Sequence, residues 1–387
     1  MSEFDRRTFL KTTAGLGVVG LGGIAGCTGG PSGDGDEDTT TESTTEDTGG
    51  GDEDTTTESD GGDEGDVTNV GMVYATGGLG DGSFNDQAQQ GLLAAADDFN
   101  VEYQETQPDE AAQFGNFQQQ LAGSTDPDYD LVSCIGFLQQ DSLSQTAPQY
   151  PDQDFQIVDQ TVDEPNVASY TFREHEGSFL AGVLATELSS MDFSAAESST
   201  ASDSTNLGFV GGIESALIKK FEAGFKAGVK YTNENFDVST SYTGSFNDPT
   251  AGQEAALSMY SSGADIVYHA SGNTGTGVFQ AAQEKGRFAI GVDRDQSVTK
   301  ESYADVILAS MVKRVDTAVY NAIEAKVNGE YPGGSQETLG LPEEGVALVY
   351  GQQLGSEVPD DVQSTVADAR QGIIDGDIEV PTDPSNV

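Results

Sequence analysis

Between residues 70 and 350, short runs typical of β-strands alternate with segments whose apolar residues recur at helical spacing. Regular alternation of this kind predicts an α/β fold with parallel sheets and helices on both faces. The folded part, from about residue 66 to residue 376, has about 310 residues and therefore favours two domains. One polar stretch, Ser190–Asn206, interrupts the pattern and is expected to be an exposed insertion.

The expected strands are Val70–Tyr74, Leu131–Ile135, Phe155–Val158, Ala168–Thr171, Leu207–Val210, Asp237–Tyr242, Ile266–His269, Arg287–Val292, Val306–Met311 and Gly345–Tyr350. The expected helices are Asp86–Phe99, Ala111–Ala122, Ser142–Gln149, Ser178–Ser189, Ser215–Asn233, Pro249–Ser262, Gly275–Glu284 and Val315–Asn328.

The loop after the first expected strand is the most distinctive local feature. Gly77–Gly82 is rich in glycine, and Ser83-Phe84-Asn85-Asp86 leads from it into a helical pattern. In an open α/β sheet such a loop lies at the carboxyl end of a strand, where ligands bind. The word Gly-Ser-Phe-Asn-Asp returns at Gly244–Asp248, again between a strand-like and a helical run. A repeat at corresponding places predicts two similar half-molecules that face one pocket.

Residues 1–27 have the order of an export signal. Arg6 and Arg7 belong to a twin-arginine motif, and the apolar run Ala14–Ala25 follows them. That run is too short to span a bilayer. Ile24-Ala25-Gly26-Cys27 matches a lipobox. We therefore expect an acylated Cys27 that holds the exported chain at the cell surface, on the outer face of the cytoplasmic membrane.

Residues 28–66 form an acidic segment of low complexity. The octamer Asp-Glu-Asp-Thr-Thr-Thr-Glu-Ser occurs twice, at Asp36–Ser43 and Asp52–Ser59. Without apolar residues to bury, such a segment cannot offset its ordering entropy, and its like charges extend it. We expect a disordered tether; partner binding and O-linked sugars on its threonines are the alternatives.

The net charge of the chain limits the salt conditions under which it can fold and the partners that it can bind. It has 66 acidic and 16 basic residues, which gives a net charge of −50. In ordinary salt such a chain would repel itself, whereas molar salt shortens the Debye length to about 3 Å. We therefore expect a halophilic protein. The charge also excludes nucleic acid as a partner, because phosphate contacts need Lys and Arg.

Catalytic and cofactor signatures are missing from the sequence. The glycine-rich segments Gly77–Gly82 and Gly272–Gly277 resemble dinucleotide loops, but neither fits the G-x-G-x-x-G pattern. The chain has two His and two Cys, too few for an obvious zinc site or His-based triad. Cys134 lies in an apolar run and is expected to be a buried filler without a disulfide mate. These features predict a protein that is not an enzyme and needs no metal or cofactor.

The region from about Val70 to Tyr350 resembles the basic membrane protein (BMP) family of ABC-transporter substrate-binding lipoproteins, which includes a purine nucleoside receptor. The matching stretches occur in the order of the family. They are Asp81–Asn85, Gly136-Phe137, Pro165–Ser169, Phe172–Phe179, Gly208–Gly212, Lys220–Phe225, Gly291–Asp293 and Met311–Asp316. The resemblance implies a type I periplasmic-binding-protein fold, in which the chain crosses three times between two Rossmann-like lobes. On that pattern lobe 1 comprises residues 67–169 and 312–334, lobe 2 comprises 170–311 and 335–376, and 377–387 is a tail.

The resemblance also implies which residues bind the ligand. Phe84 and Phe246 would cover the two faces of a base, and Asn85 would form a hydrogen bond beside it. Asp159 would accept from a ring N–H or amino group. The resemblance also places Asp81, Gly272, Asp293 and Lys313 in the site. Gly272 would let the backbone approach closely, Asp293 and Lys313 would hold ribose hydroxyls, and Asp81 lies in the same loop as Phe84.

On these grounds we expect a nucleoside-binding protein, specific for a purine nucleoside, that delivers its ligand to the permease and ATPase subunits of an ABC importer. We expect it to act as a monomer. Two alternatives remain open: a lipid-anchored chemosensory receptor for a nucleoside or other small heterocycle, and a sugar-binding member of the same fold. Permease or transducer genes nearby would separate transport from sensing.

Overall fold

The computed structural model describes residues 66–201 and 203–387. The predicted export signal with Arg6 and Arg7, the lipidation site Cys27 and the tether through residue 65 lie outside these residues. Within the described chain, no helix has both the length and the apolar character that crossing a membrane requires.

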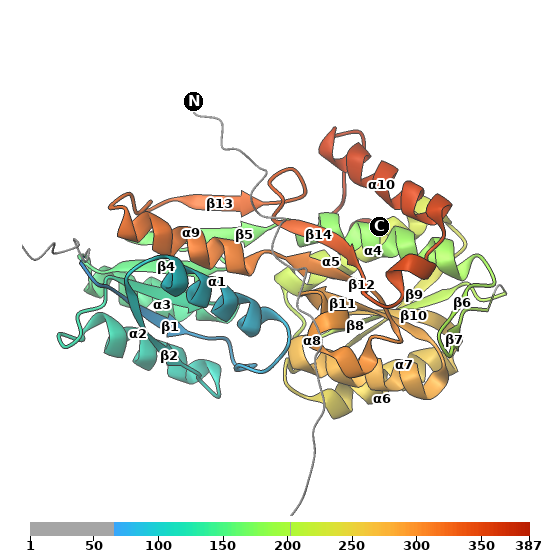
Figure 1. The fold of residues 1–387 in the computed structure, drawn as a ribbon, viewed down its shortest axis with the longest axis horizontal. Coiled ribbons are helices and arrows are strands. Elements are labelled where there is room, and N and C mark those ends of the chain that lie inside the picture. Colours follow the sequence, from blue (N-terminus) through green and yellow to red (C-terminus); the bar gives the residue numbers. More distant parts are fainter. Residues whose placement is uncertain (1–65, 202) are drawn as a thin grey trace, which may run out of the picture. The chain divides into compact units, whose positions relative to one another are not determined.

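The first of two large sheets contains six strands of the described chain, in the order β13-β5-β4-β3-β1-β2, and all of its strands run parallel. Its strands are β1 (Thr68–Val73), β2 (Val101–Thr106), β3 (Leu131–Ile135), β4 (Asp154–Val158), β5 (Val167–Phe172) and β13 (Gln336–Leu339). Its helices are α1 (Phe84–Asp98), α2 (Phe114–Ala122), α3 (Gln140–Thr146) and α9 (Val315–Val327). Figure 1 shows α1 and α9 together over one part of this sheet.

Alternate residues of these strands belong to different cores. Leu131 and Ile135 of β3 join the cluster that includes α1 and α9, whereas Val132 and Cys134 join the cluster of α2 and α3. Because successive strand side chains point to opposite faces, both faces of the sheet are covered by helices. Cys134 is buried, as the sequence predicts, and it has no disulfide partner in the part of the chain that the structure describes.

The second sheet also has six strands among the described residues, in the order β14-β12-β11-β10-β8-β9, and only its edge strand β14 is antiparallel. Its strands are β8 (Asn206–Gly211), β9 (Asp237–Tyr242), β10 (Ala264–Ala270), β11 (Phe288–Asp293), β12 (Ile307–Lys313) and β14 (Val346–Tyr350). The helices here are α4 (Glu174–Ser189), α5 (Ala216–Thr232), α6 (Pro249–Ser261), α7 (Gly275–Lys285), α8 (Gln296–Thr299) and α10 (Asp360–Ile374). A short hairpin, β6 (Ser194–Ala195) with β7 (Ser198–Ser199), lies in the predicted insertion.

The chain passes between the two sheets three times, after β5, after β12 and after β13. The half of the molecule around the first sheet is called lobe 1 and the half around the second sheet lobe 2. The sheet boundaries extend beyond the predicted lobe limits. β5 continues to Phe172, and β13 pairs with it, so residues 170–172 and 336–339 belong to the first sheet. β12 belongs to the second sheet through Lys313.

The two halves have matching strand orders, as the repeat predicts, but the two copies of the pentapeptide follow strands that do not correspond, so the prediction of corresponding positions is wrong. Gly82–Asp86 follows β1, and helix α1 begins inside it at Phe84. Gly244–Asp248 follows β9, an edge strand, and helix α6 begins after it at Pro249. In the second copy Asp248 caps its helix by accepting from Ala251 N at 3.0 Å. Each copy lies in a loop that follows a strand. Phe84 of the first copy begins a helix, whereas Phe246 of the second copy lies in the loop before its helix.

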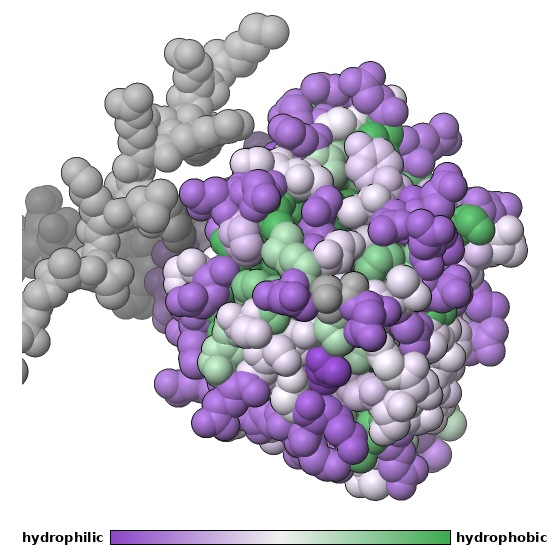
Figure 2. Space-filling model, turned by 90° about the vertical axis from the view of Figure 1, so that its right-hand side faces the viewer, coloured by the Kyte–Doolittle hydropathy of each residue, from purple (hydrophilic) through white to green (hydrophobic). Residues whose placement is uncertain are grey.

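Hydrophilic residues predominate on the face that Figure 2 shows, and apolar residues are scattered over it. This face is therefore polar, whereas the cores are apolar.

Candidate ligand-binding cavity

One cavity lies where loops at the carboxyl ends of strands from both sheets meet. The space between its lining residues, including open solvent at its mouth, is about 660 Å³. All eight side chains or backbones that the sequence places in a site line it: Asp81, Phe84, Asn85, Asp159, Phe246, Gly272, Asp293 and Lys313. The sequence missed most of its apolar wall, which includes Ile135, Phe114, Phe137, Leu217, Ile218, Phe221 and Val292.

The loop that presents Phe84 is held by a buried carboxylate. Asp81 accepts from the backbone N–H of Ser83 at 2.8 Å and of Asn85 at 3.0 Å. It thereby satisfies amides at the start of α1, which have no partner inside the helix. Burial raises the pKa of Asp81 to about 6, and these backbone donors only partly offset the increase. Asp81 therefore shapes the loop.

Asn85 is likewise engaged within the loop. Its Oδ1 accepts from Ala75 N at 2.9 Å, and its Nδ2 donates to Gly78 O at 3.1 Å and to Asp81 Oδ2 at 3.2 Å. Both amide hydrogens are therefore used inside lobe 1. Asn85 lines the cavity, and its side chain supports the loop.

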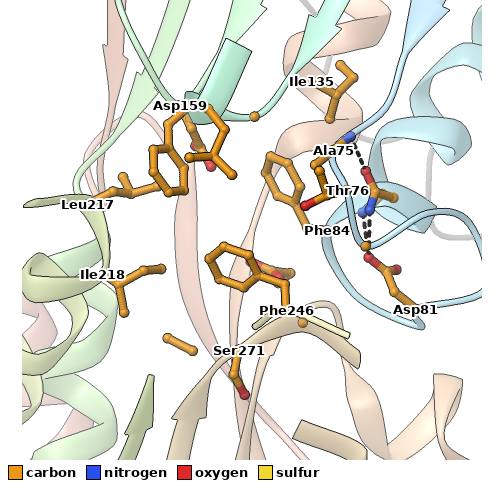
Figure 3. Close-up of a pocket in the computed structure, with 18 of the residues that line it drawn as sticks. Ala75, Thr76, Asp81, Phe84, Ile135, Asp159, Leu217, Ile218, Phe246 and Ser271 are labelled. Carbon is orange, nitrogen blue, oxygen red and sulfur yellow. Dashed lines mark hydrogen bonds between the residues drawn. The ribbon is translucent and has the colours of Figure 1, made fainter. Parts of the chain in front are cut away.

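Phe84 and Phe246 project into the cavity from different lobes (Figure 3). Phe84 is the first residue of α1. Phe246 lies in the loop between β9 and α6, where its carbonyl accepts from Thr274 N at 3.2 Å. Gly272 has a φ of +56°, and a Cβ there would lie 3.1 Å from the Phe246 carbonyl oxygen. Glycine at 272 thus permits the close approach of the two loops.

Lys313 and Asp159 form a buried ion pair that joins the two lobes. Lys313 Nζ donates to Asp159 Oδ2 at 2.6 Å, and both side chains are almost fully buried. The ammonium also lies 4.7 Å from the centre of the Phe84 ring. Asp159 Oδ1 is buried and has no hydrogen-bond partner among the described residues. The cavity wall therefore contains one carboxylate oxygen that can accept from a ligand donor.

Glu174, to which the sequence gave no role, is the third member of this cluster. It is fully buried at the start of α4, with Oε1 3.9 Å from Lys313 Nζ and Oε2 3.5 Å from Lys220 Nζ. Burial raises the pKa of Glu174 to about 7, although the two lysines partly offset the increase. Burial alone would lower the pKa of Lys313, but the attraction of Asp159, Asp293 and Glu174 raises it, so Lys313 stays charged.

Asp293 is the last residue of β11, and Asp159 directly follows β4. These two strands hold corresponding places, because each lies next to a strand after which the chain crosses to the other sheet. Both aspartates have left-handed backbone, with φ of +65° at Asp293 and +71° at Asp159. Burial raises the pKa of Asp293, while Lys313 and a hydrogen bond from Ser83 oppose the increase. Asp293 Oδ2 accepts from Ser83 Oγ at 2.5 Å, across the lobes.

Comparison with known proteins shows the family to which this chain is similar. The model of the Bmp family, described as "ABC transporter substrate-binding protein PnrA-like", matches residues 68–383. The "CD4+ T-cell-stimulating antigen" of Listeria innocua is 37% identical over 331 residues, which cover 81% of this chain and 88% of that protein. The "ABC transporter nucleoside-binding protein BmpA" of Lactococcus lactis is 32% identical, covering 80% of this chain and 88% of that protein.

Solved structures agree with the family. The ABC transporter solute-binding protein of Aeropyrum pernix aligns with a TM-score of 0.70 and 29% sequence identity, covering 82% of this chain and 95% of that protein. The architecture is therefore the α/β fold of periplasmic binding proteins, and the members of this family are solute-binding proteins and not enzymes. The chain belongs to the Bmp family of PnrA-like ABC-transporter substrate-binding proteins.

Proposed function

We propose that this protein binds a nucleoside, and a purine nucleoside in particular, between its two lobes and delivers it to the permease of an ABC importer. Ligand enters while the lobes are apart, and closure brings Phe84 and Phe246 to the two faces of the base. Hinge closure of this kind is driven by contacts that the ligand makes only in the closed form.

The observation that supports this most strongly is the combination of aromatic walls with one unpaired carboxylate oxygen. Five phenylalanines of the described chain line the cavity, and they suit the flat face of a heterocycle. Asp159 Oδ1 lies at the same cavity without a partner in the described chain, so it can accept from a base N–H or amino group. A sugar alone would need many more hydrogen-bonding groups than these apolar walls supply, so the nucleoside is favoured.

Asp293 and Lys313 are proposed to hold the ribose hydroxyls. Each already has a partner, Ser83 for Asp293 and Asp159 for Lys313. A carboxylate has about four acceptor positions and an ammonium three donors, so both groups keep capacity for a hydroxyl. The name of the Lactococcus lactis relative, a nucleoside-binding protein, supports the same ligand class for this chain.

We also propose that the protein is halophilic and is anchored to the membrane. Cys27 would carry the lipid, residues 28–66 would act as a tether, and the lobes would work at the outer face of the membrane in high salt. The protein would act there as a monomer with its permease and ATPase partners. A chemosensory receptor would share the cavity and the anchor, and it would differ in receiving a signalling partner in place of a permease.

The experiment that tests the ligand is direct. Protein purified in molar salt is denatured, and the released small molecule is identified by mass spectrometry. Calorimetry with inosine, guanosine, adenosine, uridine and ribose then ranks the affinities. Tight binding of a purine nucleoside and none of ribose is expected. Binding of a sugar, or of no nucleoside, would overturn the proposed ligand.

A further inference from the structure

A short segment of lobe 2 contacts the loop of lobe 1 that carries Phe84. The segment runs from Asp293 through α8 to Lys300, and the loop contains Gly82 and Ser83. Figure 1 shows α8 next to the loop between β1 and α1. We call these contacts the latch.

The carbonyl of Gly82 receives two donors from lobe 2. Thr299 Oγ1 donates to it at 2.8 Å, and Gln296 Nε2 donates to it at 3.4 Å. The neighbouring Ser83 Oγ donates in the opposite direction, to Asp293 Oδ2 at 2.5 Å. Hydrogen bonds thus run both ways between the two lobes at adjacent residues of one loop.

The latch also depends on close packing. Gly82 has a φ of +62°, and a Cβ at this position would lie 2.5 Å from Lys300 Cε. A side chain at 82 would therefore push against the lobe 2 segment. The half-buried Lys300 also brings a positive charge near Asp81 and Asp86, which favours the approach of the lobes.

The lobe 2 half of the latch is fixed to its own sheet. Gln296 Oε1 accepts from Val292 N at 2.9 Å and lies 2.9 Å from His269 Nε2. Because a backbone N–H can only donate, this contact fixes the orientation of the Gln296 amide, and His269 Nε2 must be the donor toward it. Gln296 N donates to Ser310 Oγ at 3.0 Å. The segment therefore moves with lobe 2.

The latch lies beside the cavity. Gly82, Ser83, Gln296 and Thr299 are absent from the set of residues that line it, and only Asp293 belongs to both. Thr299 therefore lies outside the cavity wall, whereas a change at Asp293 would alter the wall itself.

We infer that Thr299 is a positioning residue that holds the lobes closed over a bound ligand and so sets how slowly the ligand leaves. The inference rests on the proposed function for its ligand, and on the geometry at Gly82 for its mechanism. The Thr299 hydroxyl meets the Gly82 carbonyl only when the lobes are together. Its loss should shorten the lifetime of the closed form and leave the encounter with ligand unchanged.

Three variants isolate this hydroxyl. Thr299→Val removes it with little change in shape, and Thr299→Ser retains it. Thr232→Val is the matched control, because Thr232 Oγ1 donates to the Gly228 carbonyl at 2.9 Å within α5 of a single lobe. The association and dissociation rates of inosine are measured by stopped flow in molar salt. Melting temperatures report whether each variant folds.

A net hydrogen bond to a neutral carbonyl predicts about a two- to tenfold faster dissociation for Thr299→Val, with the association rate unchanged. Thr299→Ser should restore the wild-type rate, and Thr232→Val should match wild type. A wild-type dissociation rate in Thr299→Val would overturn the inference. So would an equal acceleration in Thr232→Val, which would point to general loosening of the fold.

A second measurement separates this inference from the proposed function. Spin labels at Asp128→Cys in lobe 1 and Lys285→Cys in lobe 2, both exposed positions, report the distance between the lobes in a Cys27→Ala background. Whatever ligand the purified protein retains is left in place. Thr299→Val should shift the distances toward the open form. If wild type binds no nucleoside, the proposed function fails, and the latch stands or falls on whether the two distance distributions differ.

Discussion

Lys313 Nζ lies 2.6 Å from Asp159 Oδ2, although Lys313 ends β12 of the second sheet and Asp159 follows β4 of the first. The pair crosses from lobe 2 to lobe 1 inside the cavity, beside the point where the chain itself crosses after β12. It occupies one carboxylate oxygen and leaves Oδ1 for a ligand. The side chain that makes the electrostatic contact between the lobes is therefore also the one that we propose recognises the ligand.

Asp159→Asn tests that division. A carboxylate only accepts, whereas an amide can also donate. Guanosine and inosine carry a ring N1–H that needs an acceptor, so their binding should fall more than that of adenosine. Calorimetry with the three nucleosides measures the difference. An equal loss for all three would mean that Asp159 acts through Lys313 alone.

Phe84→Ala and Phe246→Ala test the two aromatic faces. A base stacked on an aromatic side chain contributes roughly 1–3 kcal/mol, so each change should weaken purine nucleoside binding about five- to 150-fold. The double variant should deviate from additivity, because losing one face also weakens closure on the other. The half-buried Phe117 of α2, outside the cavity, supplies the control Phe117→Ala. Wild-type binding by both cavity variants, with normal folding, would place the ligand elsewhere.

Salt should govern stability. With a net charge of −50, removing salt restores repulsion over a Debye length of about 10 Å at 0.1 M. We expect the melting temperature to fall by many degrees between molar and ~0.1 M salt. Scanning calorimetry across that range is the measurement, and a constant melting temperature would contradict the halophilic interpretation.

Cys27→Ala should release the protein from the membrane fraction into the medium and leave nucleoside affinity unchanged, because the cavity lies entirely within the later chain. Deleting residues 28–66 should also leave affinity unchanged. Cell fractionation followed by calorimetry tests both changes. A Cys27→Ala protein that stays in the membrane fraction would be incompatible with a lipid anchor.

The sequence was sufficient for the architecture because most elements carry strong apolar patterns. All ten predicted strands and all eight predicted helices are present among the described residues, within a few residues of their expected ends. The missed strand β2 is an edge strand whose middle residues Glu102, Tyr103 and Gln104 are exposed, so its sequence lacks an apolar run. The missed helix α10 did carry a signal, since Val362, Val366, Ala369 and Ile373 recur at helical spacing and are buried.

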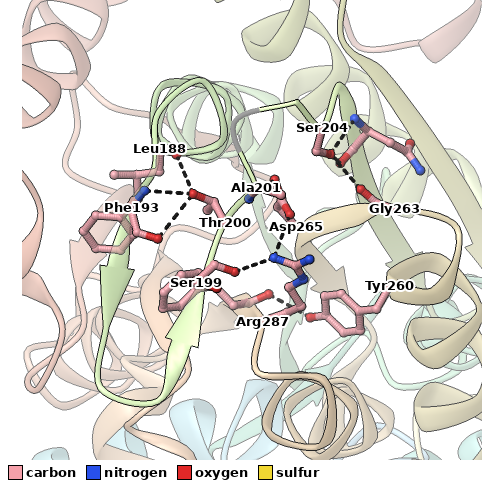
Figure 4. A network of polar contacts seen from close by, with 12 residues as sticks. Leu188, Phe193, Ser199, Thr200, Ala201, Ser204, Tyr260, Gly263, Asp265 and Arg287 are labelled. Carbon is pink, nitrogen blue, oxygen red and sulfur yellow. Dashed lines mark hydrogen bonds and ion pairs between the residues drawn. The ribbon is translucent and has the colours of Figure 1, made fainter.

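The predicted exposed insertion is exposed only in part. Among its described residues, Phe193, Ala195, Ser198 and Thr200 are buried, whereas Ser190, Asp192, Ser194, Ala196, Glu197, Asp203 and Thr205 are exposed. The ring centres of Phe193 and Phe288 lie 5.3 Å apart, and Thr200 Oγ1 donates to the Met191 carbonyl at 2.7 Å. Arg287 donates to the Ser199 carbonyl at 2.7 Å and pairs with Asp265 at 3.1 Å (Figure 4). Composition alone missed this packing, because a few well-placed polar groups can fix a segment that is mostly Ser, Thr and Asp.

The family resemblance predicted Phe84, Phe246 and the polar residues of the cavity, but little of the rest of its apolar wall. Phe221 recurs with Leu217 and Ile218 at helical spacing in α5, and this spacing is also that of an ordinary core helix. Only the fold shows that this stretch of α5 lines the cavity. Glu174 stood inside a motif used for the resemblance, yet a single acidic residue among 66 gives no sign of burial.

Glu174 makes stability depend on pH with a defined sign. Its pKa rises from 4.5 in the unfolded chain to about 7 in the fold, because it is buried. The folded state therefore binds more protons between these values, and stability falls as pH rises through that window. Glu174→Gln, which cannot ionise, should be more stable than wild type at pH 8, with the advantage shrinking by about 2 kcal/mol at pH 5. Denaturant titrations in molar salt measure it. The exposed Glu254→Gln removes the same charge and serves as the control. Matching curves for both variants would contradict a role for burial in the ionisation of Glu174.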